Sequence, residues 1–109
     1  MRIDFNAMQA HRMPGMNGGT GEMTAKLFAH EHGKVITCAI HAGGSIGLHT
    51  HETSDDINFV LSGTGVAVCD EQEEPLEAGV CHICPKGSAH SIANTGSDDL
   101  LLLTIVSER

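Results

Sequence analysis

The chain has 109 residues, of which 40% are hydrophobic, and this is enough to bury one core in a single domain. Its formal net charge of -8, with only six Lys and Arg residues, argues against a nucleic-acid partner and against an anionic membrane surface. No N-terminal apolar run resembles a signal peptide and no segment has the length of a membrane span, so we expect a cytoplasmic protein whose four cysteines are free thiols.

The N-terminal segment is rich in Met and Gly, and its glycines interrupt any regular element. We expect a flexible N-terminal arm over residues 1–24 and one domain over residues 25–109. The short sequence "GGTG" at 18–21 lacks the Lys-Ser/Thr ending of a phosphate-binding loop, and no long helix follows it.

Beyond residue 24, short β-branched and apolar segments alternate with turns rich in Gly, Ser and Asp. No stretch shows helical periodicity, and there is no internal repeat or linker. The pattern predicts an all-β sandwich or barrel, in which the charged "EQEEP" at 71–75 forms a hairpin loop. The predicted strands are 24–30, 34–40, the alternating "LHTH" at 48–51, 57–62, 66–70, 79–84, 90–94 and 100–106.

Two histidines, His49 and His51, are separated by a single residue. In a strand, positions i and i+2 face the same side, so both imidazoles project together and suit a first-row metal such as Zn, Fe, Ni, Cu or Mn. Such a pair alone is more often a solvated strand than a site. Several acids follow, of which Glu52 should point to the opposite face, while Asp55 and Asp56 remain candidates.

The spacing around this pair is specific. The first pattern reads Gly43-x5-His49-x-His51-x4-Asp56-x6-Gly63. After 15 intervening residues, the second reads Gly79-x5-Pro85-x-Gly87-x2-His90-x3-Asn94. In this order the two patterns resemble the two motifs of the cupin superfamily, and the chain is similar to its small single-domain members.

The resemblance implies a double-stranded β-helix, a jelly-roll-like barrel of two antiparallel sheets with a metal near its mouth. It also implies one divalent transition metal ion per chain (Mn, Fe, Ni, Zn or Cu), with one or two coordination positions left open for water or substrate, as in catalytic sites. The implied ligands are His49, His51, Asp56 and His90. Within the motifs, we expect Gly63 and Gly87 in tight turns and Asn94 as the anchor of a turn.

The family has Glu where this chain has Asp56, whose side chain reaches about 1.5 Å less far. Three outcomes stay open: the strand shifts inward, a water bridges to the metal, or the carboxylate leaves the metal. Alternation puts the apolar set 57, 59 and 61 on one face and Asp56, Asn58 and Val60 on the other. A simple amphipathic interpretation leaves Asp56 in solvent, but the motif register favours a face lining the cavity, where Asn58 becomes a possible pocket contact.

The remaining histidines and cysteines have no motif support. Cys81 and Cys84 are three apart on a predicted strand and so point to opposite faces, which argues against a redox or zinc pair. We expect His82 to reach solvent or a partner, and the others to lie in exposed loops or at the surface: His11, His30, His32 and His41.

The favoured function is a metal-dependent enzyme acting on a small neutral or mono-anionic carboxylate- or diol-like metabolite, of dioxygenase, decarboxylase or isomerase type. The chain has no Tyr to act as a general acid, and only Lys26 and Lys86 are plausible phosphate contacts, which disfavours phosphosugars. The alternatives are a non-catalytic small-molecule-binding module with incidental or structural metal, and a structural interaction protein. The resemblance also implies a homodimer formed through an apolar face, either 57/59/61 or 101/103/105.

Overall fold

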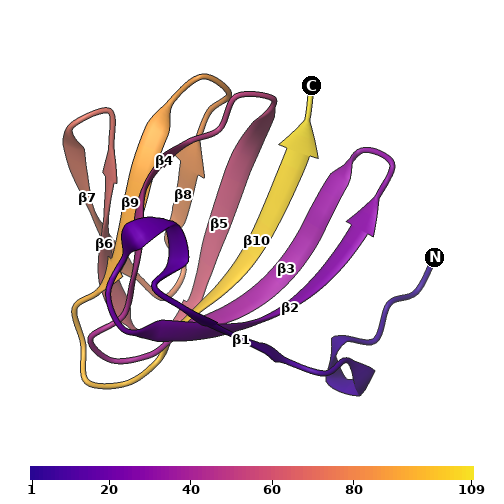
Figure 1. The fold of residues 1–109 in the computed structure, drawn as a ribbon, viewed down its shortest axis with the longest axis horizontal. Coiled ribbons are helices and arrows are strands. Elements are labelled where there is room, and N and C mark those ends of the chain that lie inside the picture. Colours follow the sequence, from indigo (N-terminus) through magenta and orange to yellow (C-terminus); the bar gives the residue numbers. More distant parts are fainter.

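A computed structural model describes all 109 residues of the protein, which fold into two antiparallel sheets. The six-stranded sheet has the order β1-β2-β3-β10-β5-β8 and the four-stranded sheet the order β4-β9-β6-β7 (Figure 1). Neither of the two short 3-10 segments has the length and apolar character to cross a bilayer. The all-β prediction of two antiparallel sheets is confirmed.

The elements follow one another along the chain as η1 (Phe5–Ala7), β1 (His11–Pro14), η2 (Met16–Gly18), β2 (Glu22–His30), β3 (Gly33–Ile40), β4 (Ser45–Thr50), β5 (Ser54–Ser62), β6 (Thr64–Cys69), β7 (Gln72–Glu77), β8 (Cys81–Cys84), β9 (Ala89–Asn94) and β10 (Leu100–Glu108). Every strand predicted after residue 24 is present, although some ends shift; β5, for example, begins three residues earlier than expected.

The prediction of a hairpin loop at 71–75 is wrong, because most of this segment belongs to strand β7. β7 pairs only with β6 and forms an edge of its sheet. An edge strand tolerates charged residues and Pro75, whose missing N–H costs no ladder bond on the open side. The turn itself is confined to Asp70 and Glu71, both with positive φ (47° and 70°), as in the tight turns that join two-residue hairpins.

The N-terminal segment contains a strand that its glycine-rich composition did not predict. β1 pairs antiparallel with the start of β2, which begins at Glu22, so the six-stranded sheet extends into residues 1–24. Thr20 donates its backbone N–H to the Ser45 hydroxyl at 2.9 Å, which ties this segment to β4. Figure 1 shows the first residues and η1 extending away from the sheets. The flexibility of the arm and the domain boundary at residue 24 stay predictions.

The core lies between the inner faces of the two sheets and is aliphatic. Ile40, Val60 and Leu100 from the six-stranded sheet and Ala67 and Ile92 from the other sheet are at most 1% exposed. Polar side chains are buried as well. Asp56, Asn58 and Thr104 form one hydrogen-bonded group, and His82 and His90 form a second one beside it. The interior therefore combines an apolar cluster with a buried polar cluster.

The motif residues that were expected in turns lie in turns. Gly63 and Gly87 have φ of 91° and 90°, in the left-handed region that favours glycine. Asn94 donates from Nδ2 to the carbonyls of Ile40 and Asp98, and its Oδ1 accepts from the Gly96 N–H, each at 2.8 Å. The prediction that Asn94 anchors a turn is confirmed.

Gly63→Ala is expected to lower the free energy of unfolding by about 2–4 kcal/mol, because a left-handed non-glycine residue costs about 1–2 kcal/mol and a forced contact adds more. A Cβ at this position would lie 2.4 Å from the Asp99 carbonyl oxygen. Gly79 is the matched control, since its φ of 92° is nearly the same but a Cβ there meets nothing within 4 Å. Urea unfolding of Gly63→Ala and Gly79→Ala compares the two, and equal losses would contradict the packing argument.

Candidate metal centre

Three imidazoles converge at one point inside the barrel. The Nε2 atoms of His49 and His51 are 3.0 Å apart, those of His51 and His90 3.1 Å, and those of His90 and His49 3.2 Å. A hydrogen bond between two neutral imidazoles needs an N–H on one of the two facing nitrogens. Three Nε2 atoms that face one another therefore leave lone pairs without a donor. Separations near 3 Å suit adjacent ligands of one ion with metal–nitrogen bonds of about 2.0–2.1 Å.

The backbone explains why these histidines meet. His49 on β4 lies directly opposite His90 on β9 in the four-stranded sheet. His51 follows the end of β4, and its N–H and C=O bond to Ser88 O (3.1 Å) and Gly87 N (2.6 Å) in the β8–β9 turn. The Pro85–Ser88 turn of the second motif therefore holds His51 of the first motif in place.

The second ring nitrogen of His49 is engaged in a hydrogen bond with the backbone. Its Nδ1 lies 2.7 Å from the Gly47 carbonyl oxygen, which only accepts, so Nδ1 carries the proton and Nε2 keeps its lone pair. This is the tautomer in which Nε2 binds a metal.

Asp56 enters the cluster from β5 of the opposite sheet. Its Oδ2 lies 3.2 Å from His90 Nε2 and 3.4 Å from His51 Nε2, nearly the spacing of the imidazoles themselves. The shorter side chain therefore lies beside two of the three imidazoles, while the group whose ligand atoms all lie within 4.8 Å of one another is His49, His51 and His90. Asn58 donates from Nδ2 to the same oxygen at 3.0 Å, and Thr104 donates its hydroxyl to Asn58 Oδ1 at 2.7 Å. The amide expected to line the pocket thus contacts the carboxylate and orients it.

The burial of β5 settles how its residues alternate. Asp56, Asn58 and Val60 are 6%, 2% and 0% exposed, whereas Phe59 and Leu61 are 40% and 50% exposed. The inward-facing prediction for Asp56 is confirmed, and the apolar set of β5 faces outward.

The protonation states suit a divalent cation. Burial alone would raise the pKa of Asp56, but the contacts of its carboxylate with His90 and Asn58 and with the nearby imidazoles outweigh it and hold that pKa below its usual value. Burial lowers the pKa of His51; the Asp56 charge opposes this shift, and the other two imidazoles reinforce it. An ionised Asp56 carboxylate and a neutral His51 imidazole are therefore favoured near neutrality, and carboxylate oxygen and imidazole nitrogen are donors that Mn, Fe, Ni, Zn or Cu ions accept.

The competing acids lie elsewhere. Glu52 is exposed. Asp55 accepts from the Lys86 N–H at 2.8 Å and pairs with the Arg109 guanidinium at 2.9 Å, and these contacts lower its pKa. Neither carboxylate is therefore offered to the histidines.

The face of the six-stranded sheet beside Asp56 is largely apolar. Val106 is the cross-strand neighbour of Asp56 and faces the same side, and Ile36 and Leu27 continue that face across β3 and β2. Leu27 is 43% exposed, so this wall reaches solvent. Lys34, the neighbour of Val106 on β3, is an exposed cation on the same face.

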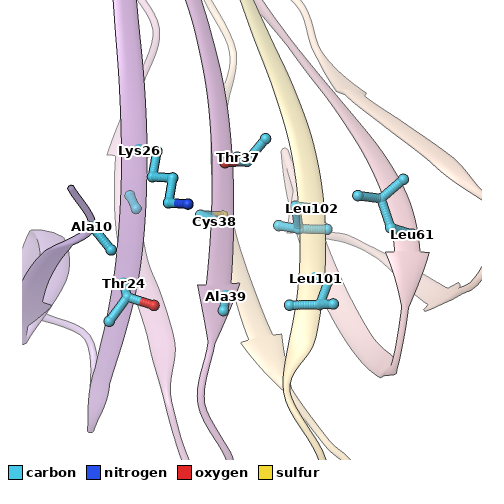
Figure 2. Close-up of a pocket in the computed structure, with 10 residues that line it drawn as sticks. Ala10, Thr24, Lys26, Thr37, Cys38, Ala39, Leu61, Leu101 and Leu102 are labelled. Atoms are coloured by element: carbon cyan, nitrogen blue, oxygen red, sulfur yellow. The ribbon is translucent and has the colours of Figure 1, made fainter. Parts of the chain in front are cut away.

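The lysines expected as phosphate contacts lie away from the site. Lys86 donates from Nζ to the Arg109 carbonyl at 2.5 Å. Lys26 lines a shallow groove of about 220 Å³ on the six-stranded sheet, where Figure 2 shows it on β2 beside Thr37 of β3, with Leu101 and Leu61 further across. Thr24, Lys26 and Leu101 alternate with buried residues, so this groove is on the outer face, away from the histidines.

The other histidines and cysteines mostly lie as predicted. His11, His30 and His32 are exposed, and His41 is partly buried against Asp99 at 2.8 Å. Cys81 is exposed and Cys84 buried, which confirms that they face opposite sides, and all four cysteines are free. Burial raises the pKa of Cys38 and of Cys84 to about 12, so neither offers a thiolate near neutrality.

The prediction for His82 is wrong, because its side chain is 0% exposed and lies behind the cluster of His49, His51 and His90. Its Nε2 is 2.9 Å from His90 Nδ1, and its Nδ1 is 2.9 Å from Glu74 Oε1. No spacing pattern marks His82. The only local signal is its place on the same strand face as Cys84, a residue type that is often buried.

Comparison with known proteins places this geometry in context. Residues 36–106 match the family model described as a cupin domain. The oxalate-binding protein of Thermotoga maritima is 37% identical over 112 residues, which cover 97% of this chain and 93% of that protein. The crystal structure of a predicted oxalate decarboxylase of Thermotoga maritima matches with a TM-score of 0.93 at 28% identity over 100% of both chains. The cupin domain of Schizosaccharomyces pombe Cnp3 matches with a TM-score of 0.82 at 12% identity over 99% of this chain and 74% of that one, a likeness of fold alone.

Proposed function

The chain belongs to the cupin domain family, and from the geometry of its histidine cluster we propose that it binds one divalent transition metal ion and, on that ion, a small carboxylate. The ligands of this proposed site are His49, His51, His90 and Asp56. The observation that carries the proposal is the convergence of three Nε2 atoms within 3.2 Å of one another, with the Asp56 carboxylate beside them.

The charge and the ligand count favour a small carboxylate. One protein carboxylate balances only part of the charge of a divalent ion. The loaded site is therefore locally positive and attracts an anion, although the net charge of the whole chain is -8. Four protein ligands leave two positions of a six-coordinate ion, which two oxygens of one carboxylate ligand can fill. The name of the Thermotoga maritima relative supports oxalate as the first ligand to test, and oxalate carries one charge more than the mono-anion that we expect from composition.

We infer a metal-dependent enzyme of decarboxylase type as the favoured activity, supported by the name of the similar crystal structure. When bound, the ion would act as a Lewis acid toward the carboxylate oxygens. His49, His51 and His90 would hold it, Asp56 would lower its charge, and the apolar wall of Val106, Ile36 and Leu27 would limit the ligand to a small size. The second candidate is a non-catalytic oxalate-binding module, favoured by the name of the curated relative.

Oxalate is expected to bind the metal-loaded protein in a 1:1 ratio and to bind the metal-free protein at least about tenfold more weakly, because the ion supplies the main attraction. Calorimetric titration of wild type and His49→Ala with oxalate, in Mn²⁺ and then Zn²⁺, measures this. Equal oxalate affinity in wild type and His49→Ala would contradict the proposed function. Formate and CO₂ released from oxalate by the loaded protein distinguish the enzyme from the binding module.

A second copy of the chain is the proposed protein partner, and the free cysteines fit the reducing cytoplasm as its compartment. The outer face of the six-stranded sheet presents Phe59, Leu61, Ile83 and Leu101, which are 40%, 50%, 50% and 37% exposed. Several exposed apolar side chains on one face of a small charged protein are typical of an interface.

Light scattering after gel filtration is expected to give about twice the chain mass of 11.5 kDa. Leu61→Lys is expected to shift the protein to monomer, because a charge would be buried in the interface. Leu48→Lys is the matched control, since Leu48 is 70% exposed and lies on the other sheet. A monomeric wild type, or dissociation by Leu48→Lys alone, would contradict this interface.

A further inference from the structure

Behind the metal centre, three side chains from three strands form a continuous hydrogen-bonded chain. Glu74 on β7 contacts His82 on β8, and His82 contacts His90 on β9, each across 2.9 Å. The rings of His82 and His90 stack with centroids 5.1 Å apart and an interplanar angle of 24°. The His82 side chain is 0% exposed, so both of its ring nitrogens depend on these two partners.

The direction of these hydrogen bonds follows from the donor inventory of the groups. An ionised carboxylate only accepts, so His82 Nδ1 must carry the proton that faces Glu74. A neutral imidazole has one N–H, which makes His82 Nε2 an acceptor. His90 Nδ1 must then donate, and His90 Nε2 is left with a lone pair directed at His49, His51 and Asp56.

We propose that Glu74 and His82 are positioning residues that hold His90 in its metal-binding tautomer, an inference that rests on the proposed metal site. Ligating histidines commonly donate their other N–H to a carboxylate, which orients the ring and strengthens the ligand. Here the imidazole of His82 stands between the carboxylate of Glu74 and the ring of His90. Glu74 on an edge strand therefore acts through His82 on His90, which is 1% exposed.

The opposite tautomer has a ready acceptor, which is why a positioning group matters. With its proton on Nε2, His90 would donate to Asp56 Oδ2 at 3.2 Å, and its lone pair would no longer face the metal position. That arrangement requires His82 to donate from Nε2 and to present an unprotonated Nδ1 to Glu74, which places two acceptors 2.9 Å apart. The metal-binding tautomer also places two acceptors face to face, His90 Nε2 and Asp56 Oδ2, but these are 3.2 Å apart and a cation joins them when the site is loaded. The closer pair at Glu74 has no such cation, so the Glu74 charge disfavours the tautomer that blocks the site.

Glu74→Gln tests the inference because an amide can donate as well as accept, so it permits both tautomers while keeping the shape of the side chain. Glu74 is 45% exposed, and the substitution leaves the packing around it in place. Its matched control is Glu73→Gln, the same change of charge at the neighbouring exposed residue of β7. Competition with a chromophoric chelator for Zn²⁺ is expected to show about tenfold weaker binding in Glu74→Gln than in Glu73→Gln.

The tautomer itself is read from ¹⁵N–¹H correlations of the imidazole rings in metal-free protein. We expect His90 to be protonated at Nδ1 in wild type and in Glu73→Gln, and to be a mixture of tautomers in Glu74→Gln. A wild-type His90 protonated at Nε2 would overturn the inference, as would equal Zn²⁺ affinities in the two variants. Absence of Zn²⁺ binding in wild type would instead contradict the proposed function, so the two failures are distinguishable.

Discussion

His49→Ala is expected to weaken binding of the divalent ion by about 100- to 1,000-fold. Binding free energies of about 10–16 kcal/mol for four-ligand zinc sites correspond to about 2.5–4 kcal/mol per ligand, and each 1.4 kcal/mol is a factor of ten. His49 offers a lone pair already directed at the other two Nε2 atoms, so its removal takes away one full ligand. Chelator competition for Zn²⁺ or Mn²⁺ measures the change.

The matched control is His41→Ala, which removes an imidazole of similar exposure that pairs with Asp99 outside the cluster. Its metal affinity should equal that of wild type. His90→Ala should lose metal as well, but His90 is 1% exposed, so this variant also leaves a cavity and lowers the stability of the metal-free protein. Equal affinities of His49→Ala and His41→Ala would contradict the site.

Asp56→Asn is expected to weaken metal binding by about 100-fold, because the substitution keeps the shape of the side chain and removes the only charged group of the proposed ligand set. Asp56 Oδ2 lies nearly as close to the Nε2 atoms of His51 and His90 as the three imidazole nitrogens lie to one another, so the carboxylate is placed to share the ion. The result should appear as a raised dissociation constant for the ion.

Asp55→Asn is the control for this change of charge, since the Asp55 carboxylate is engaged by Arg109 and by the Lys86 N–H. If Asp56→Asn and Asp55→Asn bind metal equally well, the carboxylate does not contact the ion, and the site consists of the three histidines alone. A loss confined to Asp56→Asn would show that the shorter acid serves at the position where the motif that the sequence resembles has Glu.

The placement of the histidines could be predicted because it depends on short-range regularities. Alternation in a strand directs His49 and His51 to one side, and the turn spacing around Gly87 sets the position of His90. The inward orientation of Asp56 was harder, because the apolar residues of β5 face outward. An amphipathic pattern identifies two faces but not which of them is covered, and here the polar face lines the interior.

The Glu74–His82 pair could not be predicted from local pattern. Glu74 lies in a charged segment that resembles a loop, since an edge strand needs no apolar residues on its open side. His82 becomes buried because β8 pairs with β5, which brings its side chain to the face that carries Asn58. Both facts depend on long-range strand pairing, and no spacing within a single strand encodes them.

The central claim is that His49, His51, His90 and Asp56 hold one divalent ion. Anomalous diffraction from crystals of Zn²⁺-loaded protein, collected at the zinc edge, tests it most directly. The account predicts one peak per chain at about 2.0–2.1 Å from the three Nε2 atoms and at about 2.0–2.2 Å from an Asp56 oxygen. A fully loaded protein whose anomalous peak lies away from these histidines would contradict it.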